Sequence, residues 1–226
     1  MINPYKKNAK LVLSNGFVFP GFFFGADGTA FGEIVFNTGM TGYQEVITDP
    51  SYYGQILTFT YPEIGNTGIN FEDSESNTNV KGIIVRNFSS NNSNWRSKKN
   101  FDQWLVEKNI IGLYGIDTRA LVKILRSSGA MNGVITSLDK TDESCLKIIH
   151  DTPKMEGLNL SKVVSTKQQY LWKSHTQTIF DLRKRYDESS KKLKIVAIDF
   201  GIKNSILNRL VSHGCEVLVL PSRSSL

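Results

Sequence analysis

The sequence is poor in cysteine and histidine, which excludes several kinds of site. Its two cysteines, Cys145 and Cys215, have neither the spacing of a metal-ligand motif nor the number needed for a disulfide framework. Cys145 lies in DESCLKII and Cys215 opens CEVLVLP, so both are predicted to be small buried hydrophobic residues. The three histidines are scattered and form no cluster with carboxylates. We therefore predict no metal site.

Long apolar runs are also missing. The run 17–24 is broken by proline and glycine and falls well short of the about 20 residues that a membrane-spanning helix needs. The first residues, MINPYKKNAKLVLSNG, lack the continuous apolar centre of a signal peptide and the Arg/Ser-rich helix of a transit peptide. We expect a soluble protein that works in the compartment where it is made.

The composition is that of a globular protein with an excess of positive charge. Hydrophobic residues make up 40% and charged residues 21%, and 226 residues are enough to bury a substantial core. The net charge of +6 would suit nucleic acid, but the lysines are dispersed. The one cluster, RKRYDESSKKLK at 183–194, is interleaved with acidic residues. We interpret it as a solvated linker, and keep a basic nucleic-acid-binding protein as an alternative.

The first third of the chain is predicted to be mostly β-structure. Apolar runs at 9–13, 17–24, 32–37, 55–60 and 81–86 are the strand candidates. Asn15 and Gly16, between the first two runs, form the strongest hairpin signal in the sequence.

The stretch Asn37–Asn66 is dense in residues that shape loops. It holds four glycines, Pro50, Pro62 and four tyrosines. Such a loop on a rigid scaffold is a common place for binding groups. The alternative is a pair of ordinary β-turns between strands. The tyrosines, which we expect to form wall and core around the loop, are Tyr43, Tyr52, Tyr53 and Tyr61.

Helices are predicted in the middle of the chain, at 100–109, 117–126 and 141–150, with strands at 110–113 and 131–137. Asn100 and Asp117 are the expected N-terminal caps of the first two helices. Residues 151–192 have no clear periodicity. We place a domain boundary near Lys191, between a first domain with its linker at 1–190 and a second that starts at 191–226.

The last residues predict a β-α-β unit. KIVAIDF at 194–200 and CEVLVL at 215–220 are strands, and 204–213 is the helix between them. Parallel strands of this kind are buried on both faces, which two strands and one helix cannot provide. We therefore expect a fragment that lacks most of its second domain. Asp199-Phe200-Gly201 lacks the spacing of a dinucleotide-binding turn and is interpreted as a plain βα turn.

Four segments, in order along the chain, carry a resemblance to a known family. They are GEIVFNTGMTGYQEVITDPSYYGQILTFTYPEIGN, GLYGIDTRALVKILRSSGAMNGVI, GLNLSKVVST and VAIDFGIKNSILNRLVSHGCEVLVLP. Together they resemble the small subunit of glutamine-dependent carbamoyl-phosphate synthetase. The resemblance implies an α/β protein. It would have an N-terminal β-rich domain, a swivelling β/β/α-like barrel, followed by the first β-α-β unit of a flavodoxin-like class I glutamine amidotransferase domain.

The resemblance also implies an activity and a partner. In the family, a cysteine nucleophile with histidine and glutamate hydrolyses glutamine. A large subunit then uses the ammonia with bicarbonate and ATP to make carbamoyl phosphate for pyrimidine and arginine synthesis. The expected partners are glutamine and the large subunit in a heterodimer, with neither nucleic acid nor membrane. No cofactor is expected in this chain, because ATP and magnesium belong to the large subunit. The expected location is the plastid stroma or the bacterial cytoplasm.

The chain departs from the family at the nucleophile. No Gly-x-Cys-x-Gly elbow occurs in it, and neither Cys145 nor Cys215 has the flanking glycines. The family's nucleophile, its His/Glu pair and its oxyanion loop would all lie beyond Leu226. We therefore assign no catalytic residue, and expect the 226 residues alone to be inactive.

One binding residue carries over from the family. Ser51, in TDPSYYG, matches the position where the N-terminal domain lends a serine to bound glutamine. Its hydroxyl can donate and accept at an amino-acid head group, although a serine that bonds only its own turn is the alternative. Arg119 is interpreted as a surface charge, with contact to the large subunit as a hypothesis. A non-catalytic assembly module docking on the large subunit is the alternative function.

Overall fold

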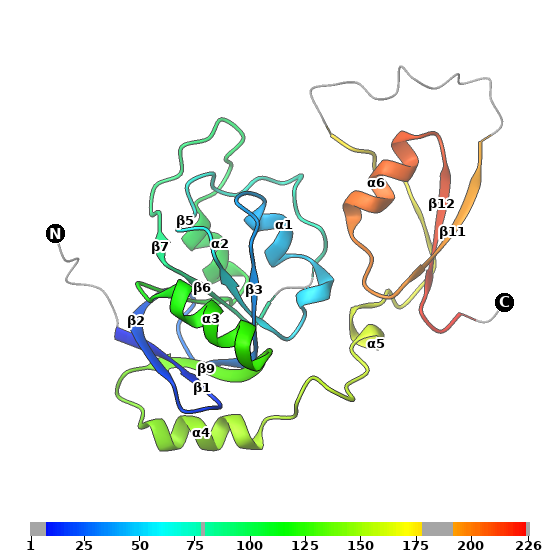
Figure 1. Cartoon of the computed structure of the whole chain (residues 1–226). Helices are drawn as coiled ribbons and strands as arrows, with labels where there is room; N and C mark the ends of the chain where they lie inside the picture. The colour runs from blue at the N-terminus through cyan, green and yellow to red at the C-terminus, as the bar shows by residue number, and fades with distance from the viewer. Residues whose placement is uncertain (1–7, 78–79, 178–191, 225–226) are drawn as a thin grey trace.

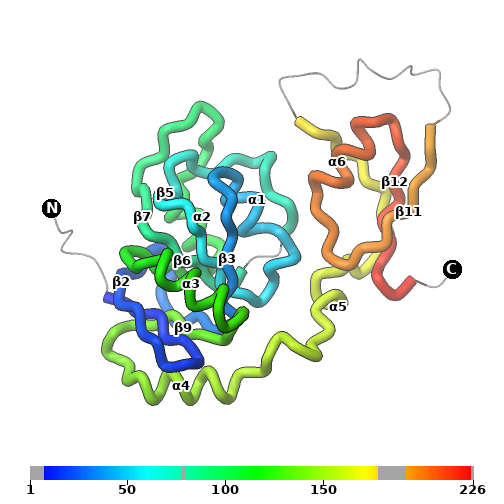
Figure 2. Tube along the Cα trace, viewed as in Figure 1, coloured from blue at the N-terminus to red at the C-terminus, as the bar shows by residue number. Residues whose placement is uncertain are grey.

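The structure, a computed structural model, describes residues 8–77, 80–177 and 192–224. Figure 1 shows two units: a barrel with helices around it, and a small sheet with one helix. In the tube of Figure 2, the chain leaves α4 (Asp142–Asp151) and passes through α5 (Ser161–Val164) before it enters the second unit.

Seven strands close the barrel of the first unit. The strands, in the order in which they pair around it, are β1 (Asn8–Leu13), β2 (Val18–Gly25), β8 (Ile111–Tyr114), β6 (Gly82–Val85), β4 (Ile56–Phe59), β3 (Ala30–Asn37) and β9 (Met131–Ser137). Neighbours from β3 through β4 and β6 to β8 are parallel, and the remaining pairs are antiparallel. The strands expected from the sequence are confirmed, and the β-rich first unit with them.

Alternating residues of these strands form two separate cores. One cluster of buried residues takes side chains from strands all around the barrel, so it fills the interior; Ile56 and Ile84 belong to it, and Leu121 and Leu125 of α3 (Thr118–Ser128) join it. Leu57, on the other face of β4, lies in a second cluster against α1 (Tyr43–Ile47) and α2 (Phe101–Glu107). A third, smaller cluster joins β1 and β9 to α4 (Asp142–Asp151).

Three of these helices begin where the sequence predicts, because a polar side chain caps each one. The Asn100 side chain accepts hydrogen bonds from the backbone N–H groups of Asp102 and Gln103. Asp117 accepts from Ala120, and Thr141 accepts from Ser144. Each cap satisfies N–H groups that the first helical turn leaves without a partner.

The second unit is a three-stranded sheet with the order β10 (Tyr170–Trp172), β12 (Glu216–Pro221) and β11 (Lys194–Asp199). The parallel pairing of β11 with β12 around α6 (Asn204–Ser212) confirms the expected β-α-β unit. β10, which the sequence did not predict, pairs antiparallel with β12. The second sheet therefore includes residues upstream of Lys191. That expected boundary itself, and most of the 183–194 cluster, lie outside the described residues.

The two faces of this sheet differ. Val217 and Val219 are fully buried against Leu207 of α6. On the opposite face Val196 and Ile198 are 59% and 49% exposed, although both are apolar. No helix among the described residues combines the length and apolar character needed to cross a membrane.

Short elements occupy the long connections. They are η1 (Pro50–Tyr52), β5 (Glu63–Ile64), β7 (Asn87–Phe88) and α5 (Ser161–Val164). The stretch Asn37–Asn66 is therefore not only a surface loop, because α1 inside it buries Tyr43 and Ile47.

Candidate functional site

The loop that carries Ser51 is anchored on its N-terminal side in the cluster between the barrel and helices α1 and α2. Tyr43, which is 6% exposed, donates a hydrogen bond from its hydroxyl to the carbonyl of Gly68 and accepts one from Thr67. Burial of the ring raises the pKa of the Tyr43 hydroxyl above its ordinary value. The expectation that Tyr43 is part of the core is confirmed, and the anchored helix α1 gives the following turn a fixed starting point.

Ser51 lies on the short 3₁₀ helix η1 with its side chain exposed. The Asp49 carboxylate caps this helix by accepting a hydrogen bond of 2.9 Å from the Ser51 N–H, and Pro50 occupies the first turn. Among the described residues, none accepts from or donates to the Ser51 hydroxyl within hydrogen-bond distance. The turn is thus held by Asp49, which leaves the serine hydroxyl available to a ligand.

The turn between β11 and α6 lies against this loop from the second unit. Lys203 Nζ is 2.6 Å from Asp49 Oδ2, and the hydrogen bond that Lys203 donates to Asp49 is the main cause of a raised Lys203 pKa. Gly201 has φ of 100°, and a Cβ at that position would lie 2.8 Å from Cγ2 of Val164 and 3.1 Å from Cβ of Pro50. A side chain at Gly201 would be strained and crowded, so glycine permits the close approach of the two units.

Asp199 holds this turn in place. It is 6% exposed, and its Oδ1 accepts hydrogen bonds from the N–H groups of Gly201 and Ile202. Its Oδ2 accepts from the Thr166 N–H at 2.6 Å. Both carboxylate oxygens are thus engaged by backbone groups, which agrees with a structural βα turn.

A cavity of about 410 Å³ lies on the side of this contact where α6 meets the loop 71–75. Glu45, Glu72, Asp73 and Glu75 supply its acidic side, and Arg209 lies across from them. The pKa of Glu45 is raised, first by burial and then by the charges of Asp73 and Glu75. Its neighbourhood therefore carries an excess of negative charge. Within the described ranges, no three or more His, Cys, Asp or Glu residues are grouped so as to hold a metal ion.

A larger cavity of about 960 Å³ lies between α4 and the barrel, and Glu33, Met131, Lys147 and Met155 contribute to its lining. Ser51 does not line either cavity.

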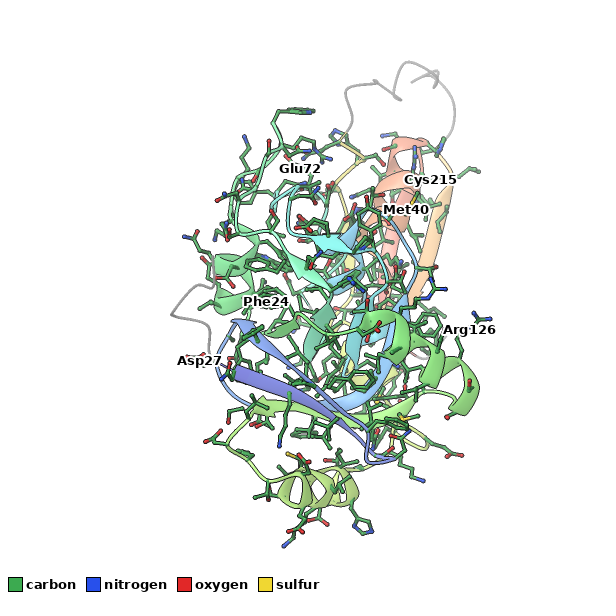
Figure 3. All side chains as sticks on the ribbon, turned by 60° about the vertical axis from the view of Figure 1, so that its left-hand side comes forward. Phe24, Asp27, Met40, Glu72, Arg126 and Cys215 are labelled. Carbon is green, nitrogen blue, oxygen red and sulfur yellow. The ribbon has the colours of Figure 1, made fainter. Side chains whose placement is uncertain are left out.

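The remaining residues singled out from the sequence lie elsewhere. Cys145 is fully buried between α4 and the barrel, as predicted. Cys215 is only half-buried, because it packs at the edge of the second core; Figure 3 shows it on the ribbon of the second unit. Asp117 caps α3, as expected. Arg119 is exposed on α3, and its contact with a large subunit remains a hypothesis.

Three charged residues at this contact were missed by reasoning from the sequence: Asp49, Glu75 and Lys203. An Asp before Pro-Ser is a turn signal, and it could have pointed to Asp49 as a cap. Glu75 and Lys203 act across the two units and have no local pattern that would reveal them.

The chain matches one family model over more than half of its length. The model described as carbamoyl-phosphate synthase small chain, CPSase domain, covers residues 11–135. The carbamoyl phosphate synthase small chain of Synechocystis sp. is 53% identical over 221 residues, which are 97% of this chain and 58% of that protein. The small chain of Aquifex aeolicus is 46% identical over 223 residues, which are 97% of this chain and 59% of the relative.

The chain therefore spans 58% to 59% of the length of these curated relatives. Among solved structures, an aminopeptidase from Aneurinibacillus sp. strain AM-1 aligns over 59% of this chain and 31% of its own, at 17% identity and a TM-score of 0.33. A likeness that low supports no conclusion about fold or function.

Proposed function

The chain belongs to the family of carbamoyl-phosphate synthase small chains, and we propose that its part in that enzyme is to form one wall of a glutamine site. The exposed Ser51 hydroxyl carries this proposal. It is presented by a turn that Asp49 caps, and Asp49 itself contacts Lys203 in the βα turn of the second unit.

The chemistry suits an amino-acid head group. A serine hydroxyl can donate to a carboxylate and accept from an ammonium. Because the turn is already ordered, it loses little conformational entropy when a ligand binds. Lys203, which is paired with Asp49, adds a charged group two residues after Gly201. The 226 residues contain no Gly-x-Cys-x-Gly motif, so the step that breaks the glutamine amide is not assigned to any of them.

In the complete enzyme, the proposed reaction sequence joins two subunits. Glutamine would be hydrolysed at the site that Ser51 borders, and the ammonia would pass to a large subunit that makes carbamoyl phosphate from bicarbonate and ATP. Pyrimidine and arginine synthesis would consume the product. The locations that we propose remain the plastid stroma and the bacterial cytoplasm, and the bacterial relatives are compatible with both.

The test is Ser51→Ala in a subunit that spans the full length of the relatives, assembled with the large subunit. Loss of one hydrogen bond to the substrate should raise the glutamine KM about tenfold, with little change in kcat. Ammonia-dependent synthesis should be unaffected, because it bypasses the glutamine site. Ser127→Ala, an exposed serine on α3, is the matched control. An unchanged glutamine KM would refute the assignment of Ser51.

A second candidate is a non-catalytic assembly module that docks on the large subunit. In the sequence beyond Leu226, a Gly-x-Cys-x-Gly elbow would support the first candidate and its absence would support the second. The two candidates differ in one measurement: the complex of the assembly module with the large subunit would show no glutaminase activity.

A further inference from the structure

Helix α6 begins without a cap from its own unit. Lys203 occupies the N-cap position and makes no side-chain hydrogen bond to the helix. The first N–H groups are taken by the barrel unit instead. Asn204 donates to the Glu75 carbonyl at 2.9 Å, and Ser205 donates to Glu75 Oε2 at 2.8 Å. Glu75 therefore caps a helix that lies 130 residues later in the chain.

Glu75 is also tied to the loop that carries Ser51. Its own N–H donates to Thr48 Oγ1 at 2.8 Å, and the Ser76 hydroxyl donates to the Thr48 carbonyl at 2.7 Å. Thr48 is 1% exposed and directly precedes Asp49, the cap of η1. A continuous set of hydrogen bonds therefore runs from the first turn of α6 through Glu75 to the turn of Ser51.

The charges favour this contact. A carboxylate at a helix N-terminus is stabilised by the helix dipole, and a charged acceptor makes a stronger hydrogen bond than a neutral one. Glu75 is 7% exposed, so little water competes for it. Burying the Glu75 carboxylate costs free energy unless hydrogen bonds compensate it. The docked position in which the first turn of α6 donates to Glu75 is therefore favoured.

A second link lies beside the first. Lys203 directly precedes Asn204, and it pairs with Asp49 at 2.6 Å. Consecutive residues of the second unit, 203–205, thus contact two parts of the barrel unit: Asp49, which follows Thr48 in the chain, and Glu75, which is hydrogen-bonded to Thr48.

We propose that Glu75 is a positioning residue that sets the second unit against the Ser51 loop, and so fixes the width of the glutamine site between them. The cap holds the start of α6, and with it the turn at 199–203, at a fixed distance from η1. This inference rests on the proposed function for its effect on glutamine, but the contact itself is tested without any substrate.

The first experiment measures amide hydrogen exchange by NMR in the 226-residue chain. In Glu75→Ala, the protection of the Ser205 amide should fall at least about tenfold, because it loses the carboxylate that accepts its hydrogen bond. The acceptor of Asn204 is the backbone carbonyl of residue 75, which the variant keeps. In Glu75→Gln, whose side-chain oxygen can still accept, most of the Ser205 protection should return. Amides of β9 should keep their protection in both variants, which shows that the barrel remains folded.

Glu107→Ala is the matched control, because it removes a carboxylate that pairs with Lys99 on the barrel surface. It should leave Asn204 and Ser205 unchanged. Unchanged protection of Ser205 in Glu75→Ala would overturn the proposal, as would an equal loss in Glu107→Ala.

The second experiment measures glutamine kinetics in the full-length subunit with its large subunit. Glu75→Ala should raise the glutamine KM about tenfold at unchanged ammonia-dependent kcat, and Glu75→Gln should restore most of it. If Ser205 loses protection while the glutamine KM stays constant, the positioning role is wrong. If instead Ser51→Ala leaves KM unchanged while Glu75→Ala still exposes Ser205, the proposed function fails and the cap between the units stands.

Discussion

At the scale of single residues, the contact between Asp49 and Lys203 should stabilise the fold in a pH-dependent way. The Asp49 carboxylate raises the Lys203 pKa above its unfolded value of about 10.4. The stabilisation from this pair is therefore fully present below about pH 10.4 and is lost as pH rises through the higher, folded-state pKa.

Asp49→Asn should lower the pKa of Lys203, which an NMR titration of the Lys203 side chain would measure. The stability difference between this variant and the unmodified chain should shrink in strongly alkaline buffer. Asp151→Asn, at the exposed pair with His150, is the control and should leave the Lys203 titration in place. A Lys203 pKa that is the same with and without Asp49 would contradict the prediction.

The charge of Glu45 should have the opposite effect and destabilise the fold. Burial raises its pKa, the charges of Asp73 and Glu75 raise it further, and Arg96 opposes them. Since the folded pKa exceeds the unfolded value of about 4.3, the ionised side chain destabilises the fold at neutral pH.

Glu45→Gln should therefore raise Tm at pH 7, and this gain should disappear as pH falls below about 4.3, where the native side chain is protonated as well. Thermal unfolding at several pH values checks this. Glu143→Gln, at an exposed position on α4, should show no such trend. A gain in Tm that does not depend on pH would point to packing instead of charge.

At the scale of secondary structure, α2 offers a paired test of burial. Leu105 is fully buried between the barrel and the helix, while the next residue, Val106, is 53% exposed. Leu105→Ala should lower the free energy of unfolding by about 2–5 kcal/mol, because it leaves a cavity in a packed cluster. Val106→Ala should cost about 0.5 kcal/mol or less. Denaturant unfolding of the two variants measures both values, and similar losses would contradict the assigned face.

The elements that the sequence predicts are those with local signals. The caps Asn100 and Asp117 and the apolar alternation of the barrel strands are visible in short windows of residues. Helix α1 was missed because it has five residues, starts after Gly42 at φ 79° and has no side-chain cap. It is stable because Tyr43 and Ile47 pack on the barrel. β10 was missed because its three residues become a strand only by pairing with β12.

The residues of the candidate site also fall into those with a local sequence signal and those that depend on contacts between distant segments. Ser51 was found through the family's DPSY pattern, and the Asp-Pro turn around it has a local signal. The contacts of Glu75 and Lys203 were not predictable, because they depend on how two units dock and join residues far apart in the sequence, 130 positions in the case of Glu75 and Ser205. No periodicity or spacing within one segment reveals such a contact.

At the scale of the whole molecule, the bare face of the second sheet predicts self-association. Val196, Ile198 and Leu171 are 59%, 49% and 52% exposed on the face opposite α6. Exposed apolar surface beside open sheet edges favours contact between copies. The 226-residue chain should therefore associate as its concentration rises.

Replacing Val196 and Ile198 together by Thr should reduce this association in analytical ultracentrifugation while changing stability little. Val219→Thr, on the face that α6 covers, should instead destabilise the second unit by about 1–3 kcal/mol, because it buries a hydroxyl. Equal association of the double variant and the unmodified chain would show that this face is not responsible.

The closure of the barrel has a consequence during synthesis on the ribosome. β9, at 131–137, is the strand that pairs with both β1 and β3, so the ring cannot close before those residues have emerged. Until then the first-made strands have unpaired edges, which are prone to aggregation, and pairing across such a long loop is slow. Slower translation after β9 would give the nascent barrel time to close before the second unit appears. The rate of synthesis should therefore affect the yield of closed barrel more strongly than the yield of the early β1–β2 hairpin.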